Sequence, residues 1–299
     1  MTTVTVTADD LLHASLALLG SRFAQRIVPL PSGAQIAVRE CGGVPGGKPN
    51  VVLLHGIGSG AASWLHAALL AGEQAHVVAW DAPGYGESTP LAGDTPADTD
   101  YAARLHELLQ ALGMDRCVLV GHSLGALMAC AYARGPNASR VERLVLISPA
   151  GGYGAPGQEA AAARVRGERR EGLRTLGVAG LAERSAERLL SPAAGAEARA
   201  WVRWNSARLR PAGYLQAVEL LCAGDLARSV GLELPIEVYC GDADVVTPPA
   251  ACRNWAKLFG ADFQLIEGAG HASPVEQPAA VASIITRAVG QAGGGPQHD

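Results

Sequence analysis

A serine between two glycines is the residue of this chain best suited to do chemistry. Ser123 lies in Gly121-His122-Ser123-Leu124-Gly125, which fits the pattern G-x-S-x-G. An apolar run, 117–120, comes directly before the motif, and a helix-forming run, 126–132, comes directly after it. A tight turn from strand to helix strains such a serine and exposes its hydroxyl, and only glycine fits at the flanking positions. This context favours a nucleophilic Ser123 over a plain glycine-rich turn.

A serine hydroxyl needs a base to take its proton and a third group to orient that base. His271 is the candidate base, because it follows the last apolar strand in a flexible loop, 268–271. His55 and His122 compete with it, since both lie at the ends of expected strands. Each of these two also adjoins a motif glycine, so its alternative role is to shape the pocket.

Two carboxylates, Asp242 and Asp244, lie in the loop 241–249, where an apolar run ends and a helix is expected to begin. Either one could hold an imidazole in the right tautomer and stabilise its protonated form. Asp244, which lies further along the loop, is favoured as the acid. Asp242 is better suited to hold the turn through hydrogen bonds to the backbone. Thr247 is expected to cap the helix that follows, with Pro248 in its first turn.

The negative charge that develops on an attacked carbonyl needs two backbone N–H groups aimed at it. The amide of Leu124, directly after the nucleophile, is one candidate for this oxyanion hole. The amide of Ile57 is the other, because the glycines of the loop 55–60 let the backbone approach a substrate closely. A phosphate site is the alternative for this loop, but its spacing is not G-x-G-x-x-G and no lysine follows it as in a P-loop.

The loops that contain these candidate residues connect apolar runs with helix-forming segments, and the two kinds of segment alternate along the chain. The alternation predicts a mostly parallel, doubly wound α/β sheet with helices on both faces. A hairpin, 26–30 with 35–40, is expected before this sheet, because the turn sequence Pro31-Ser32-Gly33 joins the two runs. Buried strands are expected at 51–54, 76–80, 117–120, 144–147, 236–240 and 263–266.

The alternation breaks at about residue 150 and resumes at 236. Residues 151–231 form helix-prone, arginine-rich segments, so we divide the chain into a core, 1–150 and 232–299, and a helical insertion, 151–231. Most of the insertion's arginines are expected to be solvated, and one or two to reach inward toward a substrate carboxylate. Trp201 and Trp204 lie three residues apart and are expected to pack the insertion onto the core.

The bulk composition is that of a compact chain of 299 residues with 17% charged residues and a formal net charge of −4. This charge indicates neither nucleic acid nor an anionic membrane as a partner. Six cysteines without C-x-x-C spacing are expected to be reduced core residues rather than a disulfide framework or a metal site. We therefore expect a small-molecule substrate, no nucleic-acid or membrane partner, and a possible homo-oligomer.

The two ends of the chain carry weaker signals. Residues 1–10 contain no basic residue, which argues against a secretory signal, and the apolar stretch 11–19 is too short to span a bilayer. A cytoplasmic location is therefore expected. Residues 9–21 are expected to form a short amphipathic helix capped by Asp9 or Asp10, and the glycine-rich tail 290–299 to be disordered.

From about residue 25 to 290 the chain resembles the α/β-hydrolase superfamily. The resemblance implies the α/β-hydrolase fold, with a helical cap at 151–231 inserted after the sixth strand. It also implies that the acid is the aspartate three residues after Gly241, which is Asp244. The order Ser123, Asp244, His271 is the order of this superfamily. The matching segments are His55–Gly58, Asp81–Ser88, Gly121–Gly125, Gly241–Pro249 and Gly268–His271.

Within the superfamily the resemblance points to two kinds of enzyme. The stretches 213–249 and 271–278 look like the 3-oxoadipate enol-lactonases. The segment 81–88 looks more like the carbon–carbon bond hydrolases that act on aromatic ring-cleavage products. Those enzymes usually carry a tryptophan after the catalytic histidine, where this chain has Ala272. Ser123 counts against epoxide hydrolases and haloalkane dehalogenases, which use an aspartate at that position.

The resemblance therefore implies a serine hydrolase that cleaves a small carboxylic ester or (enol-)lactone through an acyl-enzyme, by means of a Ser-His-Asp triad. No cofactor or metal is expected. The alternative is a carbon–carbon bond hydrolase that acts on an aromatic ring-cleavage product.

Overall fold

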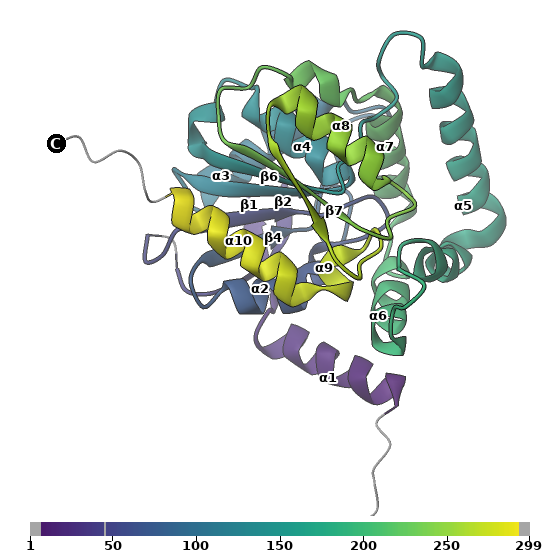
Figure 1. Cartoon of the computed structure of the whole chain (residues 1–299), viewed down its shortest axis with the longest axis horizontal. Coiled ribbons are helices and arrows are strands. Elements are labelled where there is room, and N and C mark those ends of the chain that lie inside the picture. The colour runs from purple at the N-terminus through teal and green to yellow at the C-terminus, as the bar shows by residue number, and fades with distance from the viewer. Residues whose placement is uncertain (1–6, 45, 293–299) are drawn as a thin grey trace, which may run out of the picture.

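An eight-stranded sheet forms the centre of the molecule, with helices on both of its faces (Figure 1). The computed structural model describes residues 7–44 and 46–292. The strand order is β1-β2-β4-β3-β5-β6-β7-β8. Strands β3 to β8 are parallel to one another, and β1 and β2 are added antiparallel at one edge, which confirms the predicted α/β fold and its hairpin. The strands are β1 (Gln25–Pro29), β2 (Gln35–Cys41), β3 (Asn50–Leu54), β4 (His76–Trp80), β5 (Cys117–His122), β6 (Val141–Ile147), β7 (Ile236–Gly241) and β8 (Asp262–Ile266).

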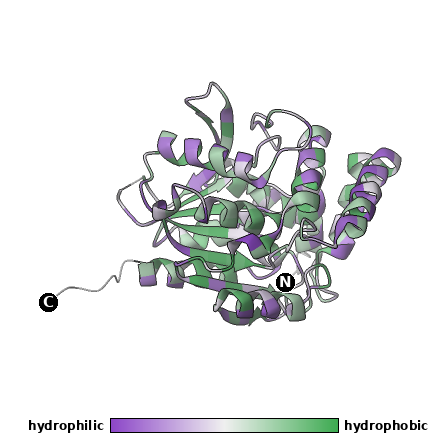
Figure 2. Cartoon of the chain, turned by 90° about the horizontal axis from the view of Figure 1, so that it is seen from above, coloured by the Kyte–Doolittle hydropathy of each residue, from purple (hydrophilic) through white to green (hydrophobic). Residues whose placement is uncertain are grey.

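The core has two layers, one on each face of the sheet. Along β3, Val51 and Leu53 pack on one face, and Val52 and Leu54 pack on the other, because successive side chains of a strand point to opposite faces. Figure 2 shows that apolar residues run through the sheet, and this is why the strands read as continuous apolar runs. The helices of the core are α2 (Leu65–Ala71), α3 (Asp98–Ala111), α4 (Leu124–Ala133), α8 (Pro249–Phe259), α9 (Ser273–Glu276) and α10 (Pro278–Ala292), with 3₁₀ turns η1 (Ala61–Trp64) and η2 (Ala138–Arg140).

Between β6 and β7 the chain is helical. It forms α5 (Glu159–Arg188), α6 (Ala196–Ser206), α7 (Pro211–Ala223) and the 3₁₀ turn η3 (Leu226–Ser229). Helix α5 stands at one side of the sheet (Figure 1). It breaks in the middle at Gly177, where φ is 62° and ψ is −174°, so that it consists of two helical segments. Glycine reaches this backbone conformation at little cost.

The two tryptophans of α6 attach the helical insertion to the core. The ring of Trp201 stacks on that of Trp204, with centroids 4.9 Å apart and an angle of 16° between the planes. Trp201 is buried in the core layer that also contains Trp64 and Leu65. The expectation that these two residues pack the insertion onto the core is confirmed.

The N-terminal helix α1 (Ala8–Ser21) differs from the expectation in its cap. The cap is Thr7, whose hydroxyl accepts a hydrogen bond from the amide of Asp10 at 3.2 Å. The Asp10 carboxylate in turn accepts one from the amide of Thr7 at 2.9 Å, so the two residues form a capping box. Predicting Asp9 or Asp10 as the cap was wrong. An acidic residue is also favourable at the third position of a helix, and Asp10 occupies that position.

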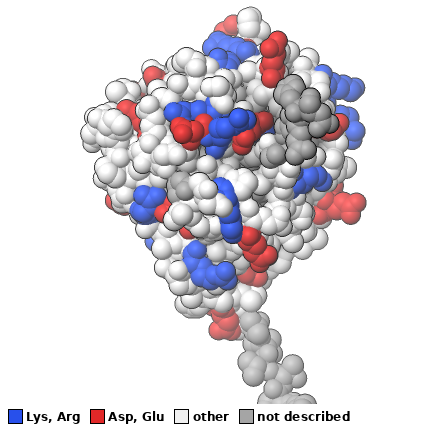
Figure 3. Space-filling model, turned by 90° about the vertical axis from the view of Figure 1, so that its left-hand side faces the viewer, with Lys and Arg blue, Asp and Glu red and all other residues white. Residues whose placement is uncertain are grey.

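At the other end, α10 continues to Ala292, so residues 290–292 are helical rather than disordered. The rest of the expected disordered tail, 293–299, and the first six residues lie outside the described part of the chain. Within the described part, we find no helix with the length and apolarity needed to cross a membrane. The face turned away from α5 mixes basic and acidic side chains (Figure 3).

Candidate active site

Ser123 occupies the turn between β5 and α4. Its φ is 52° and its ψ is −116°, a conformation that costs free energy in a residue with a side chain. The flanking glycines allow the close packing of this turn. A Cβ atom on Gly125 would lie 2.2 Å from the carbonyl oxygen of Leu54, and one on Gly121 would lie 2.7 Å from the Cα of Ala126. The strained strand-turn-helix geometry predicted around Ser123 is therefore present.

His271 and Asp244 lie against each other in neighbouring loops, one after β8 and one after β7. The Nδ1 of His271 is 2.8 Å from Oδ2 of Asp244, and both side chains are buried. The carboxylate also accepts hydrogen bonds from the amides of Val246 and Thr247, at 2.7 and 3.0 Å. Burial acts to raise the pKa of Asp244, but the hydrogen bond and charge of His271 and the Thr247 amide outweigh it and hold that pKa well below its usual range.

Asp242, the other carboxylate of the loop, contacts the backbone instead. Its Oδ1 accepts a hydrogen bond from the amide of Ala269 at 3.1 Å, two residues before His271. Within the described residues it makes no hydrogen bond to the imidazole of His271. Asp242 therefore ties the loop after β7 to the loop after β8, which fits the backbone role expected of it.

Thr247 was expected to cap α8, and the structure contradicts this. The helix begins at Pro249, its N-cap residue is Pro248, and no side chain caps it. The hydroxyl of Thr247 points to the buried pair instead: it lies 2.9 Å from Oδ2 of Asp244, 3.2 Å from Nδ1 of His271 and 3.1 Å from the carbonyl oxygen of Ser148. The Thr247 hydroxyl can donate to the Asp244 carboxylate, which is a stronger acceptor than a neutral oxygen, and nothing in the local sequence signals this contact.

The two rival histidines hold backbone segments of the site. The Nε2 of His122 donates to the carbonyl oxygen of His271 at 2.8 Å. Burial and the nearby charge of His271 lower the pKa of His122 to about 3, so its ring is neutral. His55 accepts from the amide of Ala82 through Nε2, at 3.0 Å, and its Nδ1 donates to the carbonyl oxygen of Gly56. These contacts fit the alternative role expected of both residues, which is to shape the pocket.

Ser123 and His271 line the same cleft, whose volume is about 850 Å³. Their loops meet there because the carboxyl ends of parallel strands lie at one edge of a sheet. Ser123 Oγ makes no hydrogen bond to His271 in the described structure. Such contacts between nucleophile and base often tighten only when substrate binds.

Ile57 and Leu124 line this cleft beside Ser123. The loop after β3 passes so close to the serine that a Cβ on Gly56 would lie 2.9 Å from the Cβ of Ser123. Neither the Ile57 amide nor the Leu124 amide donates a hydrogen bond to another described residue. Both N–H groups are thus available to a ligand in the cleft.

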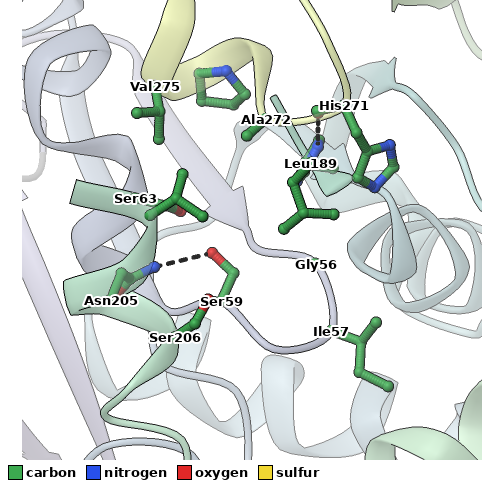
Figure 4. Close-up of a pocket in the computed structure, with 13 residues that line it drawn as sticks. Gly56, Ile57, Ser59, Ser63, Leu189, Asn205, Ser206, His271, Ala272 and Val275 are labelled. Atoms are coloured by element: carbon green, nitrogen blue, oxygen red, sulfur yellow. Dashed lines mark hydrogen bonds between the residues drawn. The ribbon is translucent and has the colours of Figure 1, made fainter. Parts of the chain in front are cut away.

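A smaller cavity also reaches His271 (Figure 4). Ser59, Ser63 and Asn205 line it, and the side-chain amide of Asn205 donates to the hydroxyl of Ser59 at 3.1 Å. Ile57 and His271 border both this cavity and the larger cleft, so the two spaces adjoin at the candidate base.

The helical insertion forms much of the wall of the larger cleft. Four arginines and two glutamates line it: Arg164, Arg169, Arg184, Arg188, Glu168 and Glu187. Arg169 is half-buried, and its Nη1 lies 3.3 Å from the hydroxyl of Tyr214. Within the described residues Arg169 forms no ion pair with a carboxylate, whereas Arg166 and Arg170 both bind Glu219.

No cluster of three His, Cys, Asp or Glu side chains in the described ranges is arranged to hold a metal ion. All six cysteines lie in these ranges and all are free thiols, and five of them are buried.

The fold agrees with the comparison to known families. A model of the Alpha/beta hydrolase family matches residues 51–284, so the chain belongs to this family. Among curated proteins it is similar to 2-hydroxy-6-oxononadienedioate/2-hydroxy-6-oxononatrienedioate hydrolase 1 of Dechloromonas aromatica, with 35% identity over 128 residues. This match covers 42% of this chain and 42% of the relative, so the chain spans about two fifths of that protein's length.

Two solved structures share the fold over most of their length. One is a thermophilic esterase from Thermogutta terrifontis, with a TM-score of 0.78, 24% identity, and coverage of 90% of this chain and 99% of that one. The other is the enol-lactonase from Burkholderia xenovorans LB400, with a TM-score of 0.76, 23% identity, and coverage of 89% and 100%. At this level of identity the likeness extends to the fold alone.

Proposed function

We propose that this protein is a serine hydrolase that cleaves a small carboxylic ester or (enol-)lactone through an acyl-enzyme. The observation that carries the proposal is that a serine on a strained turn shares one cleft with a histidine that pairs with a buried aspartate. In this proposal Ser123 is the nucleophile, His271 is the base and then the acid, and Asp244 orients His271.

The geometry supports a definite course for the protons. The Nδ1–H of His271 donates to Asp244, which leaves Nε2 free to take the proton of the Ser123 hydroxyl. Ser123 Oγ then bonds to the carbonyl carbon, and the amides of Leu124 and Ile57 stabilise the negative charge on the carbonyl oxygen. His271 returns the proton to the departing alkoxide or enolate. A water molecule, deprotonated by His271, then releases the acid and restores Ser123.

We further propose that the helical insertion, 151–231, acts as a cap over the cleft and selects the substrate. Helices of the insertion line the cleft, whereas Ser123, Asp244 and His271 all belong to the core and not to the insertion. The four arginines and two glutamates on the cleft wall give this surface a net positive charge. A substrate with a carboxylate near the scissile bond would fit this charge.

One observation favours the alternative function, a carbon–carbon bond hydrolase that acts on an aromatic ring-cleavage product. The curated relative from Dechloromonas aromatica, named as a hydrolase of 2-hydroxy-6-oxononadienedioate, is 35% identical over its matched segment. Against this alternative, Ala272 follows His271 where those enzymes usually have a tryptophan.

The test is an assay of the purified protein on a short p-nitrophenyl ester, an enol-lactone and a ring-cleavage dienoate, together with a fluorophosphonate probe. We expect covalent labelling of Ser123 and turnover of the ester or lactone. Turnover of the dienoate alone would favour the alternative. A chain that neither reacts with the probe nor turns over any of the three substrates would contradict both. The cytoplasmic location, the absence of a cofactor and the homo-oligomer remain predictions from the sequence.

A further inference from the structure

Three hydrogen bonds hold the backbone on both sides of His271. The amide of Gly270 donates to Oε2 of Glu276 at 2.7 Å, and the carbonyl oxygen of His271 accepts from His122 at 2.8 Å. The amide of Ala272 donates to the carbonyl oxygen of Leu189 at 2.7 Å. The position of the imidazole thus depends on groups outside the Ser123–His271–Asp244 set.

Glu276 connects this loop to the helical insertion. Its two carboxylate oxygens also lie 2.9 and 3.1 Å from the amide of Ser191, just after α5. The Glu276 carboxylate therefore accepts hydrogen bonds from two amides. One belongs to Gly270, directly before His271, and the other to Ser191 of the insertion, 85 positions before Glu276 in the chain. Hydrogen bonds to a carboxylate are stronger than those between neutral groups, so this bridge holds both amides firmly.

The two segments are in direct backbone contact at this point. A Cβ atom on Gly270 would lie 2.5 Å from the nitrogen of Ser191 and 2.6 Å from the carbonyl carbon of Leu190. Only glycine allows this approach, because any side chain would push the loop that carries His271 away from the insertion.

We propose that Glu276 is a positioning residue, through which the helical insertion sets the place of the His271 imidazole relative to Ser123. The inference rests on the proposed function, in which His271 is the base. When the carboxylate is present, the peptide groups at 270 and 191 are locked together. When it is absent, two amide donors lose their acceptor and the loop is free to shift. A displacement of about 1 Å at a catalytic group lowers the rate by up to about 100-fold.

The test is Glu276→Gln, which keeps the size of the side chain but replaces one acceptor oxygen with a donor NH₂ group. We expect kcat on a neutral p-nitrophenyl ester to fall by roughly 10- to 100-fold, with KM changed by less than about 3-fold, because the base is displaced and the substrate site is not. The rate of labelling by a fluorophosphonate should fall in parallel, since it too depends on the base. A role in stability alone would leave both rates per folded molecule unchanged.

Gln277→Ala is the control, because this neighbour also contacts the loop 268–271 but at a residue further from the base. The side-chain amide of Gln277 donates to the carbonyl oxygen of Gly268 at 3.1 Å. We expect the control to keep kcat within about 2-fold of the parent, the range of a surface change. Gly270→Ala should lower kcat as Glu276→Gln does, because it separates the same two segments by steric overlap without removing a charge.

The outcomes separate this inference from the proposed function. Circular dichroism first checks that Glu276→Gln and Gly270→Ala are folded. If both folded variants keep the kcat of the parent while Ser123→Ala is inactive, the positioning role is wrong and the proposed function stands. An active Ser123→Ala protein overturns the proposed function itself. Glu276→Asp gives a further check, because a shorter carboxylate should restore part of the kcat that glutamine loses.

Discussion

At the scale of single residues, the strained backbone of Ser123 is the strongest support for its proposed role as the nucleophile. Its positive φ of 52° is tolerated because β5 and α4 are both buried and hold the turn from either side. The strain exposes the hydroxyl to the cleft instead of burying it in the helix.

We therefore predict that Ser123→Ala abolishes turnover without unfolding the protein, because it removes one hydroxyl and no core volume. The loss in kcat should be at least ~10³-fold if the three residues act as a unit. Steady-state assays on one ester, with circular dichroism as the check of folding, measure this. Substantial ester hydrolysis by a pure sample of the variant would exclude Ser123 as the nucleophile.

The two aspartates of the loop after β7 allow a second prediction. Asp244→Asn should lower kcat by ~10³-fold or more, because His271 loses its charged partner and the ring tautomer is no longer set. Asp242→Asn should cost less than about 10-fold, because an asparagine oxygen still accepts from the Ala269 amide. The comparison is made on one ester at one pH. Greater damage from Asp242→Asn would assign the acid to Asp242.

At the scale of elements, the loops after β5 and β8 bring Ser123 and His271 to one cleft, and the helical insertion lines much of the rest of that cleft. The arginines of the insertion divide into two sets. Arg203, for example, forms an ion pair with Glu183 in which both side chains are about half exposed, and it lies outside the cleft. Arg169 lines the cleft, is half-buried and faces Tyr214.

We predict that Arg169→Leu weakens the transition state of a substrate that bears a carboxylate by ~1.5–3 kcal/mol, the contribution of a hydrogen bond to a charged group. A neutral p-nitrophenyl ester should be little affected. The measurement is kcat/KM on both substrates, with Arg203→Leu as the control. Equal losses on the two substrates would show that Arg169 serves the structure of the insertion rather than the recognition of an acid.

At the scale of the whole molecule, the insertion is held to the core at several separate places. Helix α1 contributes one of them, since the hydroxyl of Ser15 lies 3.0 Å from His66 of α2 and 3.3 Å from Glu197 of α6. Trp201 provides a second, and the contact of Glu276 with Ser191 provides a third. The insertion and the core are therefore expected to lose their packing together when the protein unfolds.

Global stability should also depend on pH through the buried His122. In the folded protein its pKa is about 3, whereas the unfolded residue has the ordinary value of 6.5. Between these values the unfolded state binds more protons, so the free energy of unfolding falls as the pH is lowered through this window. One group contributes at most about 1.4 kcal/mol per pH unit. Burial lowers the pKa of His55 and of His66 as well, and both act in the same direction.

The prediction is checked by urea unfolding at about pH 7 and about pH 5 for the parent and for His122→Gln. Glutamine can still donate to the carbonyl oxygen of His271 but does not titrate, so the variant should lose less stability over this interval. An equal slope for both proteins would mean that other groups carry the pH dependence.

The sequence by itself determined the parallel sheet and the turn at Ser123. It also indicated that the candidate acid and the candidate base lie in the loops after β7 and β8. These features depend on neighbours along the chain: an apolar run, two glycines around a serine, and a carboxylate a few residues after a strand. Periodicity and local spacing are enough to reveal them, because the backbone links the residues concerned.

Only the tertiary structure decided which side chains surround the histidine. Thr247 was assigned to a helix end because a cap is a local contact, yet its hydroxyl faces Asp244 and His271. Glu276 received no role because its partners include Ser191, in a different part of the chain. A hydrogen bond between residues tens of positions apart leaves no mark on the spacing of either one. It exists only once the insertion has folded back onto the sheet, and its geometry is set by the packing of both.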